Sequence, residues 1–389
     1  MYKQLTRDMS LSGMAAGIIA VVVSFGGPAA IIFQAAETVD LDNARLISWI
    51  WAISIGSGVS GIYLSMKTKT PVITAWSTPG AALLVTGWSA FSYPEAIGCF
   101  VFSGALIMFT GVTRLFSSLM ERIPRAVVAA MLAGILLRFG VDVFIHLNTA
   151  PLLVSPIIAC FVLCKRLWPR YAIIITFVVG FFAAYFQGML GDIGQVKASI
   201  AVPVFTVPEF SLRSLIGLGI PLFLVTMTGQ NVTGLAVIRA AGYKAPANPM
   251  VTATGFASVV LAPFGAHGIN LAAITAAICT GFEAHPDPGK RYPAGVICGL
   301  AYLCVGFLGA TLVAVFMALP APLISVIAGL ALFGAIISGL SQAMAEKKQQ
   351  DSALATFLIT VSGVSFLGIG SAFWGILGGL LFNLIPARD

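Results

Sequence analysis

Long apolar segments alternate with short polar or Pro/Gly-rich loops along nearly the whole chain. Because about 20 apolar residues cross about 30 Å of hydrocarbon, this alternation predicts fourteen membrane segments. We expect seven of them in residues 1–190 and seven in residues 215–389, with an external linker at residues 191–214. Seven is an odd number of crossings, so the second set must run inverted relative to the first. The pattern therefore predicts an all-α polytopic membrane protein built from two inverted seven-segment repeats.

The third segment, residues 72–89, is not an ordinary spanning helix. The proline-led, β-branched stretch from Thr70 to Trp76 favours an extended backbone. Thr78-Pro79-Gly80 then predicts a helix start with Thr78 as N-cap. The helix that follows is too short to cross the bilayer alone. A strand joined to a half-helix at membrane depth is tolerated where it lines a protein-enclosed cavity.

The tenth segment, residues 266–282, shows the same break. Small, flexible residues precede a short Ala/Ile-rich helix, with Asn270 as the expected N-cap. Such breaks can be kinks made for packing. Two of them in matching positions of the two halves instead indicate the binding site of a secondary transporter.

The amino-acid composition limits the class of protein to which the chain can belong. With 59% hydrophobic residues, 9% charged residues and a mean hydropathy of +1.00, the chain belongs in a lipid bilayer. Most of the 21 Lys and Arg fall in loops on one side of the predicted topology, which places both termini in the cytoplasm. They form no basic soluble face, so nucleic acid is not an expected partner.

No chemistry of catalysis stands out in the sequence. The six cysteines lie in apolar segments without CxxC spacing and are interpreted as small core residues. We find no nucleophile–base pair, metal-ligand cluster or phosphate loop at inward-facing positions. The sequence therefore predicts neither an enzyme nor a bound metal or cofactor.

Polar residues embedded in the apolar segments are the candidates for ligand contact. Two half-helix N-termini facing one site favour an anion, or a ring with acceptor groups. Gln230 and Asn231 lie mid-membrane, where they either bond a neighbouring helix or face a polar cavity. His267 lies at a break, where the helix dipole favours its neutral form. It either contacts substrate, carries a proton or is a structural histidine.

Several stretches resemble one family. AAIIFQAA, TAWSTPGAALLVTG, GINLAAITAAIC, EAHPD and GIGSAFWG are similar to the benzoate/proton symporter (BenE) family of bacterial inner-membrane transporters, over essentially the whole chain. This resemblance implies a fold shared with nucleobase/ascorbate and sulfate-type anion transporters. In that fold a core domain (segments 1–4 and 8–11) holds the substrate, and a gate domain (segments 5–7 and 12–14) supports its movement.

The resemblance also implies a substrate site. The carried-over positions are Ser77, Thr78, Gly80, Gln230, Asn231, His267, Gly268 and Asn270, and Phe25 is expected beside the substrate ring. Gln230 and His267 stand where the nucleobase relatives present carboxylates. That difference suits a carboxylate substrate and leaves the coupling ion open, with His267 as the proton-coupling candidate.

The sequence thus predicts uptake of an aromatic carboxylate such as benzoate, with protons, across the bacterial inner membrane by alternating access. The alternatives are an anion channel, or a transporter of another small anion or of a nucleobase-like compound. A homodimer is expected from relatives of the fold.

Overall fold

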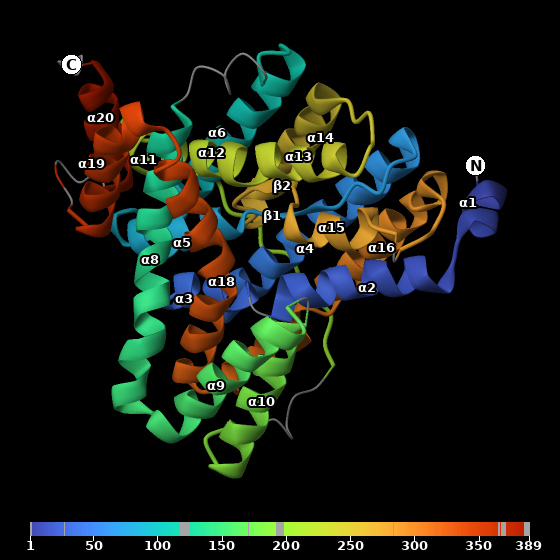
Figure 1. Cartoon of the computed structure of the whole chain (residues 1–389), viewed down its shortest axis with the longest axis horizontal. Helices are drawn as coiled ribbons and strands as arrows, with labels where there is room; N and C mark the ends of the chain where they lie inside the picture. The colour runs from blue at the N-terminus through green and yellow to red at the C-terminus, as the bar shows by residue number, and fades with distance from the viewer. Residues whose placement is uncertain are drawn as a thin grey trace.

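The computed structural model describes residues 2–26, 28–116, 124–169, 171–191, 198–282, 284–364, 366 and 371–384, and it is mostly helical (Figure 1). The elements of the first half are α1 (Tyr2–Asp8), α2 (Leu11–Gly26), α3 (Ala29–Glu37), α4 (Asn43–Thr68), β1 (Thr74–Trp76), α5 (Thr78–Gly87), α6 (Tyr93–Val112), α8 (Arg125–Thr149), α9 (Pro151–Leu167) and α10 (Ala172–Phe186).

The second half begins with a helical run whose turns alternate between α and π geometry: α11 (Leu212–Ser214), the π turn η3 (Leu215–Gly219), α12 (Ile220–Thr226), the π turn η4 (Met227–Val232) and α13 (Thr233–Ala240). It continues with α14 (Ala247–Leu261), β2 (Ile269–Leu271), α15 (Ile274–Thr280), α16 (Tyr292–Phe307), α17 (Gly309–Met317), α18 (Ala321–Ala343), α19 (Gln350–Val361) and α20 (Ser371–Leu384). Short 3₁₀ turns η1, η5, η6 and η7 cover Trp88–Ala90, Ala262–Phe264, Pro288–Lys290 and Lys347–Gln349.

Seven helical stretches among the described residues are long and apolar enough to cross a membrane. An eighth is added if α16 and α17, which meet at a bend of 67°, form one crossing. The chain is therefore a multi-pass helical membrane protein. The count of fourteen segments stays a prediction, because broken and shorter helices do not meet the same length criterion.

Three pairs of long helices carry much of the packing: α4 lies along α16, α6 along α14, and α8 along α18. Glycines stand at each contact. A Cβ added at Gly58 would meet Gly299 O at 2.7 Å, one at Gly255 would meet Met108 N at 2.4 Å, and one at Gly329 would meet Phe139 O at 2.3 Å. Small residues of this kind let helix backbones approach closely, which drives helix association in lipid.

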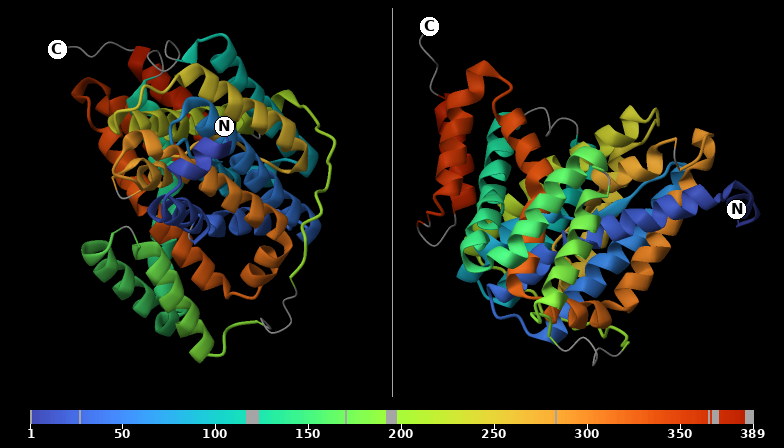
Figure 2. Two further views of the ribbon diagram at one scale, coloured as in Figure 1. Left: turned by 90° about the vertical axis from the view of Figure 1, so that its right-hand side faces the viewer. Right: turned by 60° about the horizontal axis from the view of Figure 1, so that its bottom comes forward.

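The described part of the predicted linker is extended and runs along one edge of the molecule (Figure 2). It is tied by backbone bonds to helices of both halves: Ala201 N donates to Phe307 O, Thr206 N to Pro263 O, and Glu209 N to Pro94 O. Residues 192–197 lie outside the described residues. The next helix starts at Leu212, three residues before the predicted boundary at 215.

Candidate functional site

Both predicted breaks contain a short strand, and the two strands pair. Figure 1 shows them in the middle of the molecule, with α12 and α13 on one side and α2 and α4 on the other. The ribbon is antiparallel, and Ala75 of β1 lies opposite Asn270 of β2. All strand residues are buried. Because the strands are antiparallel, the half-helices α5 and α15 leave the ribbon at opposite ends.

Two serines from different helices satisfy backbone groups at the ribbon. Ser65 Oγ of α4 donates to Val72 O at 3.0 Å and accepts from Val72 N at 3.1 Å. Ser258 Oγ of α14 does the same for Ile269, at 3.2 Å and 2.8 Å. Buried backbone groups in a bilayer need such partners. Ser258 of α14 thus holds β2 itself, and Ser65 of α4 holds the chain two residues before β1.

The N-terminus of α5 is capped by Ser77. Its hydroxyl accepts from Gly80 N at 3.1 Å and from the Thr226 hydroxyl at 2.9 Å. The predicted cap at Thr78 is wrong by one residue, because the extended backbone of Ser77 (φ −76°, ψ 96°) places its hydroxyl over the third helical N–H. Gly80 fits tightly there: an added Cβ would meet Leu222 Cδ1 at 2.8 Å.

Asn270 lies in β2 and does not cap α15. The helix begins at Ile274, and its N-cap, Ala273, makes no side-chain cap. In the orientation that suits its neighbours, the Asn270 amide oxygen accepts from Ser77 N at 3.0 Å and its nitrogen donates to Leu271 O at 3.1 Å. Asn270 therefore joins the two breaks to each other.

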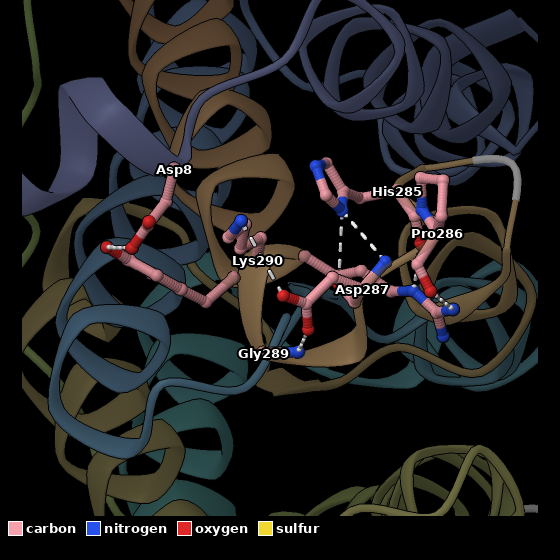
Figure 3. A network of polar contacts seen from close by, with 8 residues as sticks. Asp8, His285, Pro286, Asp287, Gly289 and Lys290 are labelled. Carbon is pink, nitrogen blue, oxygen red and sulfur yellow. Dashed lines mark hydrogen bonds and ion pairs between the residues drawn. The ribbon is translucent and has the colours of Figure 1, made fainter.

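The other end of α15 is stabilised by Arg291. Its guanidinium donates to Thr280 O at 2.7 Å, to His285 O at 2.6 Å and to Pro286 O at 3.2 Å. Figure 3 shows His285 and Pro286, two of these acceptors, in the loop between α15 and α16. A cation at a helix C-terminus complements the helix dipole. Arg291 thereby fixes the loop that orients α15.

His267 is fully buried, and both of its ring nitrogens are engaged. Nδ1 lies 2.9 Å from Trp49 Nε1, and Nε2 lies 2.9 Å from Ser77 O. Because the indole N–H donates and the carbonyl accepts, the ring is neutral with its proton on Nε2. His267 therefore links α4 to the cap of α5. Protonating Nδ1 would require the bond from Trp49 to break.

The eighth predicted segment brings Asn231 and Gln230 into the π turn η4. Asn231 is fully buried; its oxygen accepts from Leu271 N at 3.0 Å, and its amide donates to Met227 Sδ at 3.4 Å. Gln230 is half-buried, and its side chain makes no hydrogen bond to a described residue. π turns occur often at functional sites.

The segments that carry Gln230 and Thr78 touch through the residues next to them. A Cβ built at Gly229, the neighbour of Gln230, would meet Pro79, the neighbour of Thr78, at 3.4 Å. Thr78 is also half-buried, and the described residues supply no hydrogen-bond partner for its hydroxyl. Thr78 and Gln230 are thus the predicted site residues whose polar side chains remain available.

Phe25 lies at the C-terminal end of α2 and is 7% exposed. Its ring contacts those of Trp76 and Tyr302, with centroids 6.3 Å and 6.0 Å away. The Trp76 Nε1–H is buried and has no hydrogen-bond partner among the described residues. This aromatic cluster therefore contains a free donor.

Sequence reasoning missed the residues that hold the site from other helices. Trp49, Thr226, Ser65 and Ser258 bond the ribbon or the cap through side chains. They carry no local sequence signal, because each partner lies on a different segment. Among the described residues, no group of three His, Cys, Asp or Glu side chains could hold a metal ion.

Comparison with known proteins places this geometry in a family. The chain matches the family "Benzoate membrane transport protein" (BenE) over residues 7–385. It is 43% identical over 98% of its length to "Benzoate membrane transport protein" of Acinetobacter baylyi, and 41% identical over 96% to "Inner membrane protein YdcO" of Escherichia coli, covering 97% and 96% of those chains.

Solved structures share the fold at low sequence identity. The chain superposes on SLC26A9 with a TM-score of 0.65 at 14% identity, covering 95% of itself and 64% of that longer chain. It superposes on the transmembrane domain of the cyanobacterial bicarbonate transporter BicA with a TM-score of 0.60 at 12% identity, covering 95% of itself and 97% of that domain. With a matching family over nearly all of its length and close relatives above 40% identity, the chain belongs to the benzoate membrane transport protein (BenE) family.

Proposed function

We propose that the protein carries benzoate or a similar aromatic carboxylate across the bacterial inner membrane by alternating access. Its family is one of membrane transport proteins and not of enzymes. The name of the Acinetobacter relative points to benzoate as the substrate, and the name of the Escherichia relative points to the inner membrane. Among the anions that such a fold can handle, benzoate combines a carboxylate with an apolar ring, and the site offers partners to both.

The observation that carries the site proposal is the division between free and engaged polar groups. Thr78 and Gln230 are half-buried, and their side chains bond no described residue, whereas the side chains of Ser77, Asn231 and His267 are buried and hydrogen-bonded. An amide N–H and a hydroxyl donate to a carboxylate at no cost of a broken protein bond. We infer that Thr78 and Gln230 contact the carboxylate, and that the other predicted residues shape the ribbon beneath it.

The substrate ring is proposed to lie toward Phe25. The Phe25–Trp76–Tyr302 cluster provides aromatic faces, and the free Trp76 Nε1–H adds a neutral donor. Ring pairs of this kind favour offset or edge-on contact beyond simple burial. Gly268 and Asn270 complete the proposed site by accepting from Ser77 N across the two breaks, and Gly80 completes it by its close fit against Leu222.

We further propose the fourteen-segment inverted repeat, with core and gate domains and a relation to nucleobase/ascorbate transporters. Its boundaries are residues 1–190 and 215–389, and both termini are cytoplasmic. Support comes from the ribbon, which pairs one strand from each half; a serine of the preceding long helix bonds β2 itself and the chain two residues before β1. We also propose a homodimer, because relatives that share this fold commonly form one.

Proton coupling through His267 is the remaining proposal. Because His267 bonds both Trp49 and Ser77, taking up a proton would rearrange the cap of α5. That link is a physical route from protonation to the substrate site. His267→Gln is expected to abolish accumulation driven by a proton gradient while retaining exchange of labelled for unlabelled benzoate.

The test is uptake of labelled benzoate into proteoliposomes containing the purified protein, with and without an inward proton gradient. Saturable accumulation that collapses with an uncoupler supports proton-coupled transport of benzoate. Non-saturating flux without accumulation would indicate a channel. No benzoate uptake by folded protein would overturn the substrate and direct the search to other small anions.

A further inference from the structure

A cleft of about 580 Å³ lies away from the ribbon, between α2 and α15 on one side and α9, α10 and α18 on the other. Its described lining includes Phe161, Ile173, Ile278, Phe282 and Leu330, and none of the nine predicted site residues lines it. Pro28, which also lines it, follows the same helix that carries Phe25. The cleft thus approaches the proposed substrate site from one side.

Lys165 is the charged residue among the described lining residues. It lies near the C-terminal end of α9 and makes no hydrogen bond or ion pair with a described residue. Lys165 is not needed to stabilise the nearby C-terminal end of α15, because Arg291 already donates to Thr280 O. Lys165 is itself exposed, so it attracts an anion as a surface charge does, with added strength on the side of the apolar walls.

We propose that this cleft is a second binding station for the aromatic carboxylate, occupied between the ribbon and the aqueous phase. The carboxylate pairs with Lys165, and the ring lies against Phe161 and Phe282. One cation among apolar side chains complements an anion with an apolar body. This inference rests on the proposed function, because it takes the same substrate class.

Two residues of the chain offer matched tests. Arg166, the next residue on α9, has the same charge but does not line the cleft. A Cβ added at Gly334 of α18, which does line it, meets no heavy atom within 4 Å. Gly334→Leu therefore places a larger side chain at the cleft from a position where the Cβ has open space, and it replaces a poor helix former with a good one.

The experiment measures initial rates of labelled benzoate transport against concentration, in membrane vesicles of both orientations, after size-exclusion chromatography has shown each variant folded. For transport starting on the cleft side, Lys165→Gln is expected to raise the half-saturating concentration by about two- to fivefold, the range for an exposed ion pair. Lys165→Arg restores the wild-type value, and Arg166→Gln leaves it unchanged. Gly334→Leu raises it as Lys165→Gln does.

Several results overturn the proposal. If Lys165→Gln and Arg166→Gln behave alike, or if Lys165→Gln acts equally from both sides, the charge has no local role. If the cleft holds only a lipid chain, Lys165→Gln and Gly334→Leu leave benzoate saturation unchanged. Wild-type protein that transports no benzoate removes the proposed function and this station together, whereas active wild type with silent variants removes the station alone.

Discussion

At the scale of single residues, hydrogen bonding separates side chains that build the site from those free to contact a ligand. His267 and Asn231 are committed to Trp49 and Leu271, and Thr78 and Gln230 are not. The sequence identified all four as candidate site residues, but it could not tell which of them bond the protein and which are available to a ligand. The partner of His267 lies 218 residues away, and no local pattern announces it.

Removing the free groups should weaken substrate binding without weakening the fold. We expect Gln230→Leu and Thr78→Val each to raise the KM for benzoate by about tenfold or more, because a hydrogen bond to a charged group contributes about 1.5–3 kcal/mol. Neither side chain has a described protein partner, so thermal unfolding in detergent should not change. Asn231→Leu is the control, because it leaves Leu271 N without its hydrogen-bond acceptor and should lower the midpoint of thermal unfolding. Unchanged KM in both test variants would remove these residues from the site.

The Trp49–His267 bond should contribute to stability. Trp49→Phe keeps an aromatic ring but leaves buried Nδ1 without its donor, a loss of about 1–3 kcal/mol. We expect a lower midpoint for thermal loss of monodisperse protein. Trp51→Phe is the matched control, since Trp51 makes an aromatic contact with Phe264 but no side-chain hydrogen bond to a described residue. Equal midpoints for the two variants would contradict the assignment.

At the scale of elements, the sequence predicted both breaks because Pro, Gly and β-branched residues act locally. It placed the cap of α5 one residue late, at Thr78 instead of Ser77, and assigned Asn270 to a cap although it forms part of β2. The choice between neighbouring hydroxyls depends on backbone geometry, and the pairing of β1 with β2 joins segments about 190 residues apart. The π turn around Gln230 depends on packing in the same way.

The contact between α6 and α14 should tolerate no added volume. A Cβ at Gly255 would lie 2.4 Å from Met108 N, a backbone atom that cannot move aside as a side chain can. We expect Gly255→Ala to destabilise the protein by about 1–3 kcal/mol, the usual cost of overpacking. Gly334→Ala, where the added Cβ meets open space, should be neutral or stabilising. The test compares the thermal unfolding midpoints of Gly255→Ala and Gly334→Ala. Equal midpoints would show that α6 and α14 can move apart to accept the added methyl group.

At the scale of the whole molecule, α4 and α14 bond the region of the ribbon, and α16 and α6 pack along these two helices. The extended part of the linker, residues 198–211, runs along the edge of the molecule and donates backbone hydrogen bonds to Pro94, Pro263 and Phe307. Figure 1 shows α8, α18, α19 and α20 grouped to one side of this assembly. The cleft lies where α9, α10 and α18 face α2 and α15. If transport moves α9, α10 and α18 against α2 and α15, the distance between the two walls of this cleft changes during the cycle.

Linking the two walls of the cleft should therefore stop transport. Ile173 lines it from α10 and Ile278 from α15, so the double variant Ile173→Cys/Ile278→Cys places one thiol on each wall. Treatment with bifunctional thiol reagents of increasing length should abolish benzoate uptake at the lengths that bridge the walls, and reduction should restore it. Each single variant and the wild type, with its six native cysteines, receive the same treatment as controls. Full activity in a molecule shown by mass spectrometry to be bridged by a short reagent would mean that the walls of this cleft do not move apart during transport.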